Sequence, residues 1–328
     1  HCSTKSSSAP NACSADPTSN DESDTALMSG PPRNSLRATG YLPPEFLTLQ
    51  ELPERARANL PDTSWDYLAG AAETETTYLR NRMSLDSLAF RPRVCRNVEV
   101  VDVTGAFMGR KLRLPVFLAP IGSLESFADG GGVAAARGAA AFGVDHMLSS
   151  VTKPDLETVA GAVEQATLFQ LYVRGDDGFI DDYVRRAVDA GFRAFAITVD
   201  TAHYSRRERD IIKRYLPAGR ARGTNSTGHN WQMAFTWDNV KRFKDKHDIP
   251  LILKGVATAE DAAIAVEHGV DCIYVSNHGG RQLDYGRGAI DVLPEVVEAV
   301  AGKAEIAIDG GFCRGTDIVK AMILGANA

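Results

Sequence analysis

Short apolar runs alternate with amphipathic stretches from about residue 115 to residue 328. Each run is a few residues long and rich in Val, Ile, Leu, Phe or Ala, which is typical of strands buried on both faces of a sheet. The runs lie at 116–119, 146–149, 168–172, 194–199, 251–254, 272–275 and 305–308. Between them, helical spacing of apolar residues predicts helices over about 131–142, 155–164, 177–190, 237–247, 259–268, 291–301 and 315–324.

Glycines mark the ends of several predicted helices, just before the next apolar run. Gly143, Gly191, Gly269 and Gly325 stand where a helix commonly ends in a left-handed residue. Strands that alternate with helices predict a parallel sheet covered by helices on its faces. Seven such units favour an eight-fold βα barrel over a doubly wound sheet.

Polar residues gather at the carboxyl ends of the predicted strands. They are Gln170, Tyr172, Thr198, Asp200, Lys254, Ser276, His278 and Asp309. Barrel enzymes place their chemistry on that face, with contributions from many strands, whereas a doubly wound sheet binds ligands at one switch point. No GxGxxG follows a strand, so a nicotinamide-binding fold has no support. The predicted class is α/β, a (β/α)8 TIM barrel with an N-terminal helical extension.

The stretch that precedes the barrel divides into a tail and a helical segment. Residues 1–40 are poor in apolar side chains and rich in Ser, Pro, Asn and Asp, which predicts a disordered or low-complexity tail. Residues 41–328 are predicted to form the barrel domain. Within about 43–80, two sets of apolar residues recur at helical spacing on either side of Pro61, and they predict one apolar face. These sets are Leu49, Leu52, Ala56 and Leu60, then Trp65, Leu68, Ala69 and Ala72.

Three features bear on the completeness and boundaries of the domain. The chain stops at Ala328, where an eighth strand is due, so we expect strand 8 and the C-terminal end to be missing. Residues 207–235 form the longest connection and are predicted to be a lid or disordered. The chain begins at His1 rather than Met; we expect a cytoplasmic protein by default, or an exported one if a signal was removed ahead of His1.

Composition narrows the class of protein. The 44% hydrophobic and 24% charged content is typical of a globular domain. The net charge of −6, without a basic block, argues against nucleic acid as a partner. No apolar run reaches the roughly 18 residues of a membrane span. The five cysteines form no CxxC pair, so no metal site is expected, and they are predicted to be free thiols.

The stretch Ser276-Asn277-His278-Gly279-Gly280-Arg281-Gln282-Leu283-Asp284 is the densest group of candidate chemistry. His278 can move protons near neutral pH, and Arg281 offers a planar fork of donors that matches a carboxylate or phosphate. The two glycines allow a sharp turn or a close approach to a ligand. The local alternative is an ordinary turn with a solvated His and Arg.

Other strand-end residues fit chemistry around His278. Asp200 can orient a catalytic imidazole, and Arg207 can clamp a carboxylate together with Arg281. Lys254, at the end of an apolar strand, is expected to face a negatively charged ligand group. Gly310-Gly311 with Arg314 opens the last helix and is a candidate phosphate site at a helix N-terminus.

These residues carry a resemblance to a known family. The stretch from Ser276 to Asp284 resembles the signature of the FMN-dependent α-hydroxyacid oxidases and dehydrogenases, which include glycolate oxidase, lactate oxidase, lactate monooxygenase and mandelate dehydrogenase. The similarity runs from about Tyr41 to Ala328. Supporting matches are Trp65-Asp66-Tyr67, Phe90-Arg91-Pro92-Arg93, Leu118-Ala119-Pro120, Gln170-Leu171-Tyr172, Thr198-Val199-Asp200-Thr201, Arg206-Arg207-Glu208, Leu253-Lys254-Gly255 and Asp309-Gly310-Gly311.

The resemblance implies a role for each matching residue. His278 matches the base that takes a proton from the substrate, and Asp200 matches its partner. Arg281 and Arg207 match the anchors of the substrate carboxylate, with Tyr67 and Tyr172 as hydroxyl partners of the substrate. Lys254 matches the lysine beside flavin N1 and O2. The matches to FMN contacts are Pro120, Ile121, Gly122, Ser149, Gln170, Thr198, Lys254, Ser276, Asp309, Gly310, Gly311 and Arg314.

The implied activity is FMN-dependent oxidation of a small (S)-2-hydroxy acid to the 2-oxo acid, with O2 reduced to hydrogen peroxide. A dehydrogenase with another electron acceptor, or a monooxygenase on the same scaffold, is the alternative; a non-catalytic flavin-binding barrel is a third. The family also implies a homo-oligomer, a tetramer.

Two positions depart from the family pattern, and a third bears on the reaction with oxygen. Val151 replaces a bulky aromatic of glycolate oxidase-like members, and Cys313 replaces a common phosphate-binding Arg. Gly122 stands where the family has Gly or Ala near flavin N5, and the smaller residue accompanies altered oxygen reactivity in family members.

Overall fold

The computed structural model describes residues 46–165, 168–215 and 231–328. Thr48–Ala328 form one compact unit. The tail predicted over 1–40 lies outside the described residues, as does the middle of the lid predicted over 207–235. The described part of that connection contains a short helix, α8 (Glu208–Ile212), which the sequence reading did not predict.

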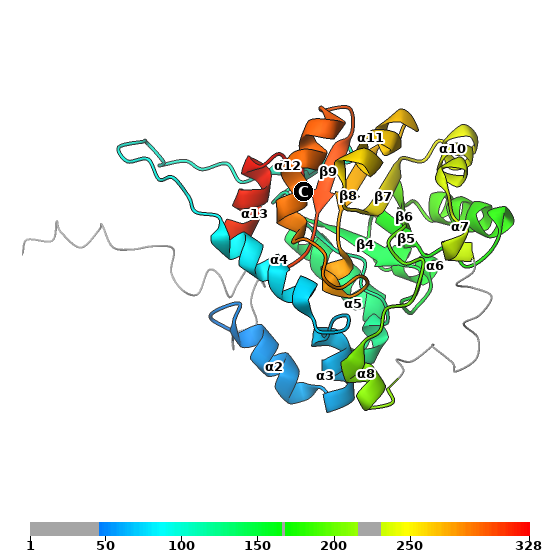
Figure 1. The fold of residues 1–328 in the computed structure, drawn as a ribbon, viewed down its shortest axis with the longest axis horizontal. Coiled ribbons are helices and arrows are strands. Elements are labelled where there is room, and N and C mark those ends of the chain that lie inside the picture. The colour runs from blue at the N-terminus through cyan, green and yellow to red at the C-terminus, as the bar shows by residue number, and fades with distance from the viewer. Residues whose placement is uncertain (1–45, 166–167, 216–230) are drawn as a thin grey trace, which may run out of the picture. The chain divides into compact units, whose positions relative to one another are not determined.

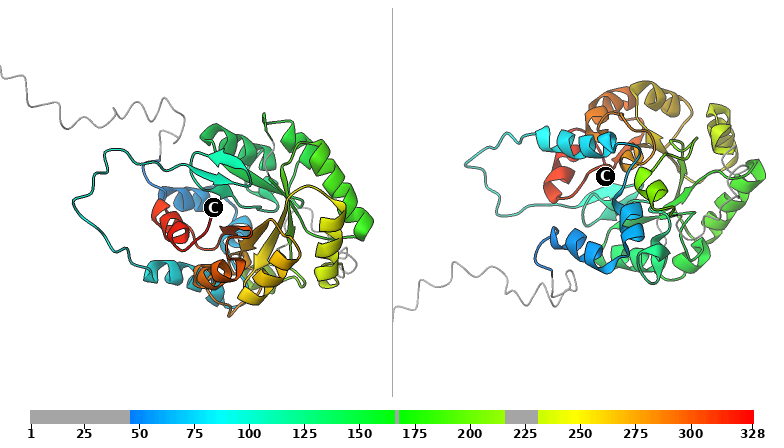
Figure 2. Two further views of the ribbon diagram at one scale, coloured as in Figure 1. Left: turned by 90° about the horizontal axis from the view of Figure 1, so that it is seen from above. Right: turned by 60° about the horizontal axis from the view of Figure 1, so that its bottom comes forward.

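Seven parallel strands form the central sheet, and they pair in the order in which they occur along the chain. The strands are β3 (Phe117–Leu118), β4 (Asp145–Ser149), β5 (Leu168–Leu171), β6 (Ala194–Thr198), β7 (Leu251–Val256), β8 (Cys272–Val275) and β9 (Glu305–Ile308). This sequential order is that of a βα barrel, and the sheet curls accordingly with helices outside it (Figures 1 and 2). The α/β barrel prediction is therefore confirmed over seven strands.

The last residues of the chain run beside β9. The Asn327 N–H donates to the Ile306 carbonyl at 2.7 Å, and the Ile308 N–H donates to the Ala328 carbonyl at 3.0 Å. These bonds place Asn327 and Ala328 at the position in the sheet that was expected for an eighth strand.

Helices follow the strands and bury a core between themselves and the sheet. They are α5 (Gly131–Phe142), α6 (Leu156–Ala160), α7 (Asp177–Asp189), α10 (Trp237–Lys246), α11 (Ala259–Glu267), α12 (Ala289–Val300) and α13 (Gly315–Ile323). The four glycines predicted to end helices have φ between 73° and 109°, which confirms that expectation. Helix α6 is shorter than the predicted 155–164, because Gly161 follows it and glycine disfavours helix continuation.

An antiparallel hairpin that the sequence reading missed covers the amino ends of the strands. It consists of β1 (Gly105–Phe107) and β2 (Arg110–Leu112). Phe107 and Leu112 join the core inside the curl of the sheet, and the Phe107 ring stacks on Phe117 at 5.1 Å. Arg110 pairs with the fully buried Asp145 at 2.7 Å, and Arg193 pairs with the same carboxylate. The amino end of the sheet is thereby closed.

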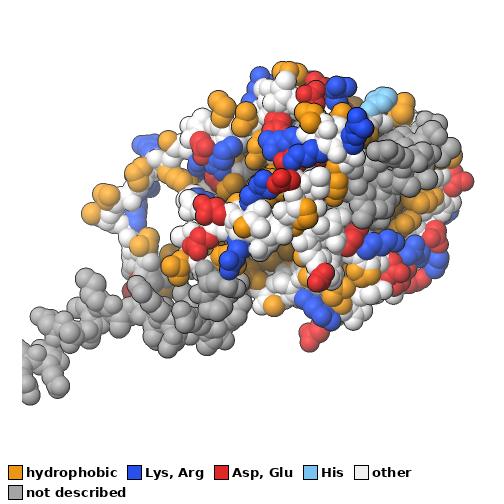
Figure 3. Space-filling view, turned by 90° about the horizontal axis from the view of Figure 1, so that it is seen from below, with side chains coloured by type: hydrophobic (Ala, Val, Ile, Leu, Met, Phe, Trp, Pro, Cys, Tyr) orange, Lys and Arg blue, Asp and Glu red, His pale blue; other side chains and the backbone are white. Residues whose placement is uncertain are grey.

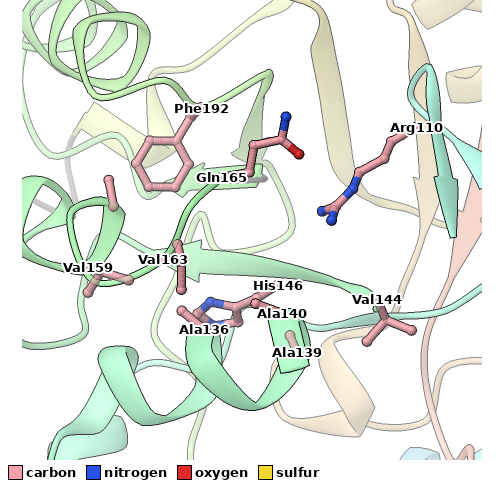
Figure 4. Close-up of a pocket in the computed structure, with 11 residues that line it drawn as sticks. Arg110, Ala136, Ala139, Ala140, Val144, His146, Val159, Val163, Gln165 and Phe192 are labelled. Atoms are coloured by element: carbon pink, nitrogen blue, oxygen red, sulfur yellow. The ribbon is translucent and has the colours of Figure 1, made fainter. Parts of the chain in front are cut away.

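A small cavity lies between β4 and helices α5 and α6, near this closed end. It has a volume of about 20 Å³, which is room for about one water molecule. His146, Arg110 and Gln165 are the polar side chains that line it, among apolar ones that include Phe192 (Figure 4). Burial lowers the pKa of His146 to about 4, so this imidazole is neutral at pH 7.

The N-terminal extension consists of α2 (Glu51–Asn59), α3 (Asp62–Ala69) and α4 (Thr76–Ser87). The apolar face predicted for this region is buried at Ala72, but it is wrong for the two helices: α2 buries no side chain, and α3 buries Ser64 and Tyr67. Helix α4, which extends past the predicted limit of 80, buries the polar Thr77 and Asn81. Its buried face binds loops through hydrogen bonds, and a pattern of apolar residues cannot reveal such a face.

A long loop, residues 88–104, joins α4 to β1 and projects away from the barrel (Figures 1 and 2). Its valines Val94, Val98, Val100, Val101 and Val103 are exposed. On the face drawn in Figure 3, basic and acidic side chains are interspersed rather than gathered by sign. Among the described residues, no helix combines the length and the apolar character that crossing a membrane requires.

Candidate active site

A cavity of about 280 Å³ opens at the carboxyl ends of the strands. Its lining comes from α3, from the loops after β3, β4, β5 and β9, from the approach to α8, and from β7 and the loop after β8. The lining residues are Tyr67, Leu68, Ala119, Pro120, Ile121, Gly122, Phe127, Val151, Tyr172, Arg207, Lys254, His278, Gly279, Arg281, Asp309, Gly310 and Gly311. Most residues predicted for substrate or FMN binding therefore meet at one site.

His278 lies between a carboxylate and a phenol. Its Nδ1 is 3.1 and 3.2 Å from the two carboxylate oxygens of Asp200, and its Nε2 is 3.2 Å from the Tyr172 hydroxyl. An ionised carboxylate can only accept hydrogen bonds, so Nδ1 carries the proton and donates to Asp200. Nε2 is then the acceptor, and it faces the cavity together with Tyr172.

Electrostatics keep this pair in the charge state that a general base requires. Burial is the largest influence on the pKa of His278 and lowers it; Asp200 raises this pKa, Lys254 and Arg207 lower it, and the net shift is downward. Burial alone would raise the pKa of the Asp200 carboxyl, yet the neighbouring His278 and Lys254 bring that pKa below its ordinary value. At neutral pH the imidazole is neutral and the carboxylate is ionised.

Lys254 is buried beneath the cavity and is bound on two sides. Its Nζ donates to Ser276 Oγ at 2.9 Å and lies 3.3 Å from Asp309 Oδ2. Ser276 Oγ in turn donates to Asp309 Oδ1 at 2.5 Å and accepts the His278 N–H at 3.0 Å. The ammonium is thus held in place below the cavity, next to the loop that carries His278.

A row of buried polar side chains continues under the cavity along neighbouring strands. Ser149 donates to the Gln170 carbonyl oxygen at 2.8 Å, and the Gln170 amide donates to Thr198 Oγ1 at 2.9 Å. All three are less than 5% exposed. Buried polar side chains of this kind are kept where a ligand or a network satisfies them.

Two arginines, Arg207 and Arg281, lie close together at the cavity. Within the described residues, neither Arg207 nor Arg281 forms an ion pair with a carboxylate. Their guanidinium carbons lie 5.7 and 5.4 Å from the centre of the Tyr67 ring. Burial and the neighbouring Arg207 charge lower the pKa of Arg281 to about 10, so Arg281 remains a cation at pH 7. Two adjacent cations at a cavity favour an anionic ligand.

Arg281 also has structural partners that the sequence did not indicate. One of its terminal nitrogens donates to the Leu68 carbonyl at 3.0 Å and to the Gly70 carbonyl, and the other donates to the Tyr67 carbonyl at 2.6 Å. These are carbonyls of the last turn of α3, whose dipole favours a cation. Arg281 thus positions Tyr67, which is 6% exposed and stacks on Phe127.

The loop after β8 makes a tight turn against α4. His278 has φ 59°, a left-handed conformation that costs a residue with a side chain roughly 1–2 kcal/mol. At Gly280 (φ 75°) a Cβ atom would lie 2.4 Å from the Tyr78 nitrogen, so only glycine fits. Asp284 accepts hydrogen bonds from the N–H groups of Thr74, Thr76 and Thr77 and from the Thr74 hydroxyl.

Gly122 and Val151 are in tight contact at one wall of the cavity. A Cβ atom at position 122 would lie 2.7 Å from Val151 Cγ2, which is closer than carbon atoms pack. The two residues therefore restrict each other's size. Pro120 and Ile121 line the same wall.

Arg314 and Cys313 stand at the N-terminus of α13. The N–H groups of Cys313 and Arg314 donate to the buried Asp317 carboxylate at 3.0 and 3.1 Å. Arg82 binds the same carboxylate and the Gly311 carbonyl, and it holds the pKa of Asp317 down to about 2. These two amides are therefore engaged by Asp317, and Arg314 lies outside the cavity lining. Its predicted part in phosphate binding stays a prediction.

Comparison with known proteins places this constellation in a family. A family model described as FMN-dependent dehydrogenase matches residues 56–328. The chain belongs to this family. It is 37% identical over 301 residues to the glycolate oxidase of Spinacia oleracea, which covers 86% of this chain and 82% of that protein. It is also 37% identical over 306 residues to an L-lactate oxidase of a Nostoc species, which covers 86% and 84%.

Solved structures agree with the family assignment. A crystal structure of mandelate oxidase superimposes with a TM-score of 0.80 at 36% sequence identity, covering 86% of this chain and 84% of that one. The FMN-dependent dehydrogenase family uses FMN, and the residues of this chain fit a flavin. The buried row Ser149, Gln170 and Thr198 offers polar groups below the cavity, Lys254 provides a fixed cation, and Gly310 and Gly311 bring backbone to the lining.

Proposed function

We propose that the protein oxidises a small (S)-2-hydroxy acid to the 2-oxo acid and passes the two electrons to O2, giving hydrogen peroxide. The overall reaction balances as R–CH(OH)–COO⁻ + O2 → R–CO–COO⁻ + H2O2. The observation that carries the proposal is the arrangement at one cavity of a neutral His278 on Asp200 and two arginines that, among the described residues, form no ion pair with a carboxylate.

The protein residues divide the work. Arg207 and Arg281 bind the substrate carboxylate, and Tyr67 and Tyr172 offer their hydroxyls to the substrate. His278 Nε2 takes a proton from the substrate, and the Asp200 carboxylate stabilises the imidazolium that results. When bound, FMN accepts the electron pair of the substrate C–H bond.

The remaining predicted contacts hold the cofactor. Lys254 offsets negative charge on the flavin, because a fixed ammonium in a buried setting is poorly screened. The proposed FMN contacts are Pro120, Ile121, Gly122, Ser149, Gln170, Thr198, Ser276, Asp309, Gly310, Gly311 and Arg314. Asp309 additionally pairs with Lys254, so it also positions this ammonium.

The cavity favours a substrate with an apolar side chain. Leu68, Ile121, Phe127 and Val151 line it, and an apolar side chain of the substrate removes these residues from contact with water. Glycolate, lactate, longer 2-hydroxy acids and mandelate together span the relevant sizes of the side chain. The relatives named above act, by their names, on glycolate, lactate and mandelate.

A direct experiment tests the proposal. The purified protein, reconstituted with FMN, is expected to be yellow and to bleach when a 2-hydroxy acid is added anaerobically. A substrate screen over the four acids, with oxygen uptake and peroxide recorded, identifies the acid and the acceptor. A protein that binds FMN but is not bleached by any of them is a non-catalytic barrel, and the proposal is then wrong.

Gly122 favours a second candidate, a dehydrogenase or monooxygenase on the same scaffold. Without a side chain at this position the space is filled by Val151 alone. Bleaching without peroxide, but with turnover of an artificial dye, would identify a dehydrogenase. Oxygen uptake with a decarboxylated acid as product, in place of peroxide, would identify a monooxygenase.

The resemblance to the family also supports a homo-oligomer, which we propose to be a tetramer. Sedimentation equilibrium of the purified protein measures its mass directly. A monomer mass over the whole concentration range would contradict this part of the proposal.

A further inference from the structure

Asn81 and Asn277 form a reciprocal amide pair at the back of the active-site turn. The Asn81 Nδ2 donates to Asn277 Oδ1 at 2.9 Å, and the Asn277 Nδ2 donates to Asn81 Oδ1 at 2.7 Å. Asn81 is 1% exposed and lies on α4, whereas Asn277 directly precedes His278. The pair therefore joins a helix of the N-terminal extension to the loop that carries the candidate base.

Each amide of the pair has further backbone partners in the same loop. Asn277 Oδ1 also accepts the Gly280 N–H at 3.1 Å, and its Nδ2 also donates to the Arg287 carbonyl at 3.0 Å. Asn81 Oδ1 accepts the Ala289 N–H at 3.0 Å. The loop is thus bound at its beginning, within its turn and at its end, so that its shape depends on the pair.

The turn needs such support because its conformation is unfavourable. His278 is held at φ 59°, Gly279 at φ 65° and Gly280 at φ 75°, three left-handed residues in succession. A strained backbone persists only where surrounding contacts determine it. The contacts that do so here are the Asn277 side chain across the turn and the His278 N–H on Ser276 Oγ.

We propose that Asn81 is a positioning residue for His278, acting through Asn277. This inference rests on the proposed function, in which His278 Nε2 accepts the substrate proton. Without the pair, the turn relaxes toward ordinary backbone angles, and the imidazole loses its alignment between Asp200 and Tyr172. The fold remains, because α4 is also bound through Asp284 and through Arg82.

Two substitutions of Asn81 separate positioning from simple loss of packing. In Asn81→Leu the pair is lost at every pH. In Asn81→Asp a carboxylate oxygen faces Asn277 Oδ1 and repels it, but a protonated carboxyl donates to that oxygen and restores the pair. Among the described residues, the Asn81 side chain is hydrogen-bonded to the Asn277 amide and the Ala289 N–H, and it lies beside the backbone at Gly310 and Gly311; none of these groups titrates.

The first measurement is the pH profile of turnover, from about pH 5.5 to about pH 8.5, relative to wild type. The matched control is Asn97→Asp, on the exposed loop, whose Oδ1 accepts the Glu99 N–H and continues to do so. At high pH we expect both Asn81 variants to lose on the order of tenfold to a hundredfold in kcat. The loss of kcat in Asn81→Asp relative to wild type becomes smaller as pH falls, whereas the loss in Asn81→Leu stays constant.

The second measurement follows His278 itself by NMR of isotope-labelled histidine, with the ring signal assigned from His278→Gln. We expect this signal to shift in Asn81→Leu and in Asn81→Asp at high pH, and to return toward the wild-type position in Asn81→Asp at low pH. Thermal unfolding confirms that each variant is folded. If Asn81→Leu does not fold, Asn277→Asp is used for the same comparison, because it loses the side-chain donor to Asn81.

The two measurements keep the inference separate from the proposed function. If the wild-type protein oxidises no 2-hydroxy acid, the proposed function fails, and the NMR comparison alone decides whether Asn81 positions His278. A His278 signal that is the same in folded Asn81→Leu as in Asn97→Asp overturns the inference. So does a deficit in Asn81→Asp that does not change with pH.

Discussion

The two ends of the same parallel strands carry buried charges of different character. At the amino ends, the guanidinium groups of Arg110 and Arg193 both bind the carboxylate of Asp145, and Arg193 also binds carbonyls of the hairpin. At the carboxyl ends, Arg207 and Arg281 border the cavity, and within the part of the chain that the structure describes neither forms an ion pair with a carboxylate. Buried cations need a partner, so the carboxyl end is suited to bind an anion and the amino end is already satisfied.

The two ends also hold one histidine each, His146 buried and His278 partly buried. His146 points into a cavity with room for about one water molecule, and burial alone lowers its pKa. His278 has the Asp200 carboxylate on one nitrogen and the active-site cavity at the other. Burial by itself therefore does not single out a candidate catalytic group. What singles out such a group is a partner that fixes the tautomer of the imidazole, together with space for a substrate at the opposite nitrogen.

The largest expected effect comes from the histidine at the carboxyl end. We expect His278→Ala to lower turnover by about 10²–10⁴-fold while FMN stays bound, because general-base catalysis is lost. Stopped-flow reduction of the flavin measures it. His146→Gln is the matched change at the amino end and is expected to keep its turnover per folded molecule. Flavin reduction at a near-normal rate in His278→Ala would remove His278 from the proposed mechanism.

The second-largest expected effect is a loss of stability, and it concerns the charge cluster at the amino ends of the strands. Asp145→Asn leaves two arginines without their carboxylate, and removing one member of a buried ion pair costs about 3–5 kcal/mol. Urea unfolding measures the loss, and the variant is expected to keep its kcat at temperatures where it is folded. An unchanged unfolding free energy would mean that the amino-end cluster does not stabilise the barrel.

At the carboxyl end, Arg281→Lys keeps the charge but loses the planar fork. We expect binding of the substrate to weaken by about 1–3 kcal/mol, with FMN binding changed less. Steady-state KM and FMN titration measure the two quantities. The outcome that contradicts the anchor role is a KM and a kcat that both match the wild type.

The smallest effect is a pH dependence that needs no mutation. The base must be neutral, so kcat/KM is expected to fall as pH drops through the pKa of His278, by about tenfold per pH unit below it. Burial places that pKa below the ordinary histidine value of about 6.5. The profile of His146→Gln is expected to overlay that of the wild type. A midpoint clearly above 6.5 would contradict the direction of the shift.

Much of the barrel and the chemical core of the site could be predicted from the sequence. Apolar runs alternating with helical periods are local signals, and parallel strands bring their carboxyl ends to one face. That rule is sufficient to gather Asp200, Lys254 and His278 from three strands. The left-handed glycines at helix ends could be predicted for the same reason, because each depends only on its own backbone.

Contacts between polar groups that lie far apart in the chain were decided only by the tertiary structure. The amide pair of Asn81 and Asn277 joins residues 196 positions apart, and Asp284 binds Thr77 across 207 positions. Arg281 was predicted as a carboxylate anchor, yet its bonds to the carbonyls of α3 became visible only when that helix was in place. A polar residue buried by partners elsewhere leaves no periodic pattern along the chain, so the support of the active-site turn could not be read from the sequence.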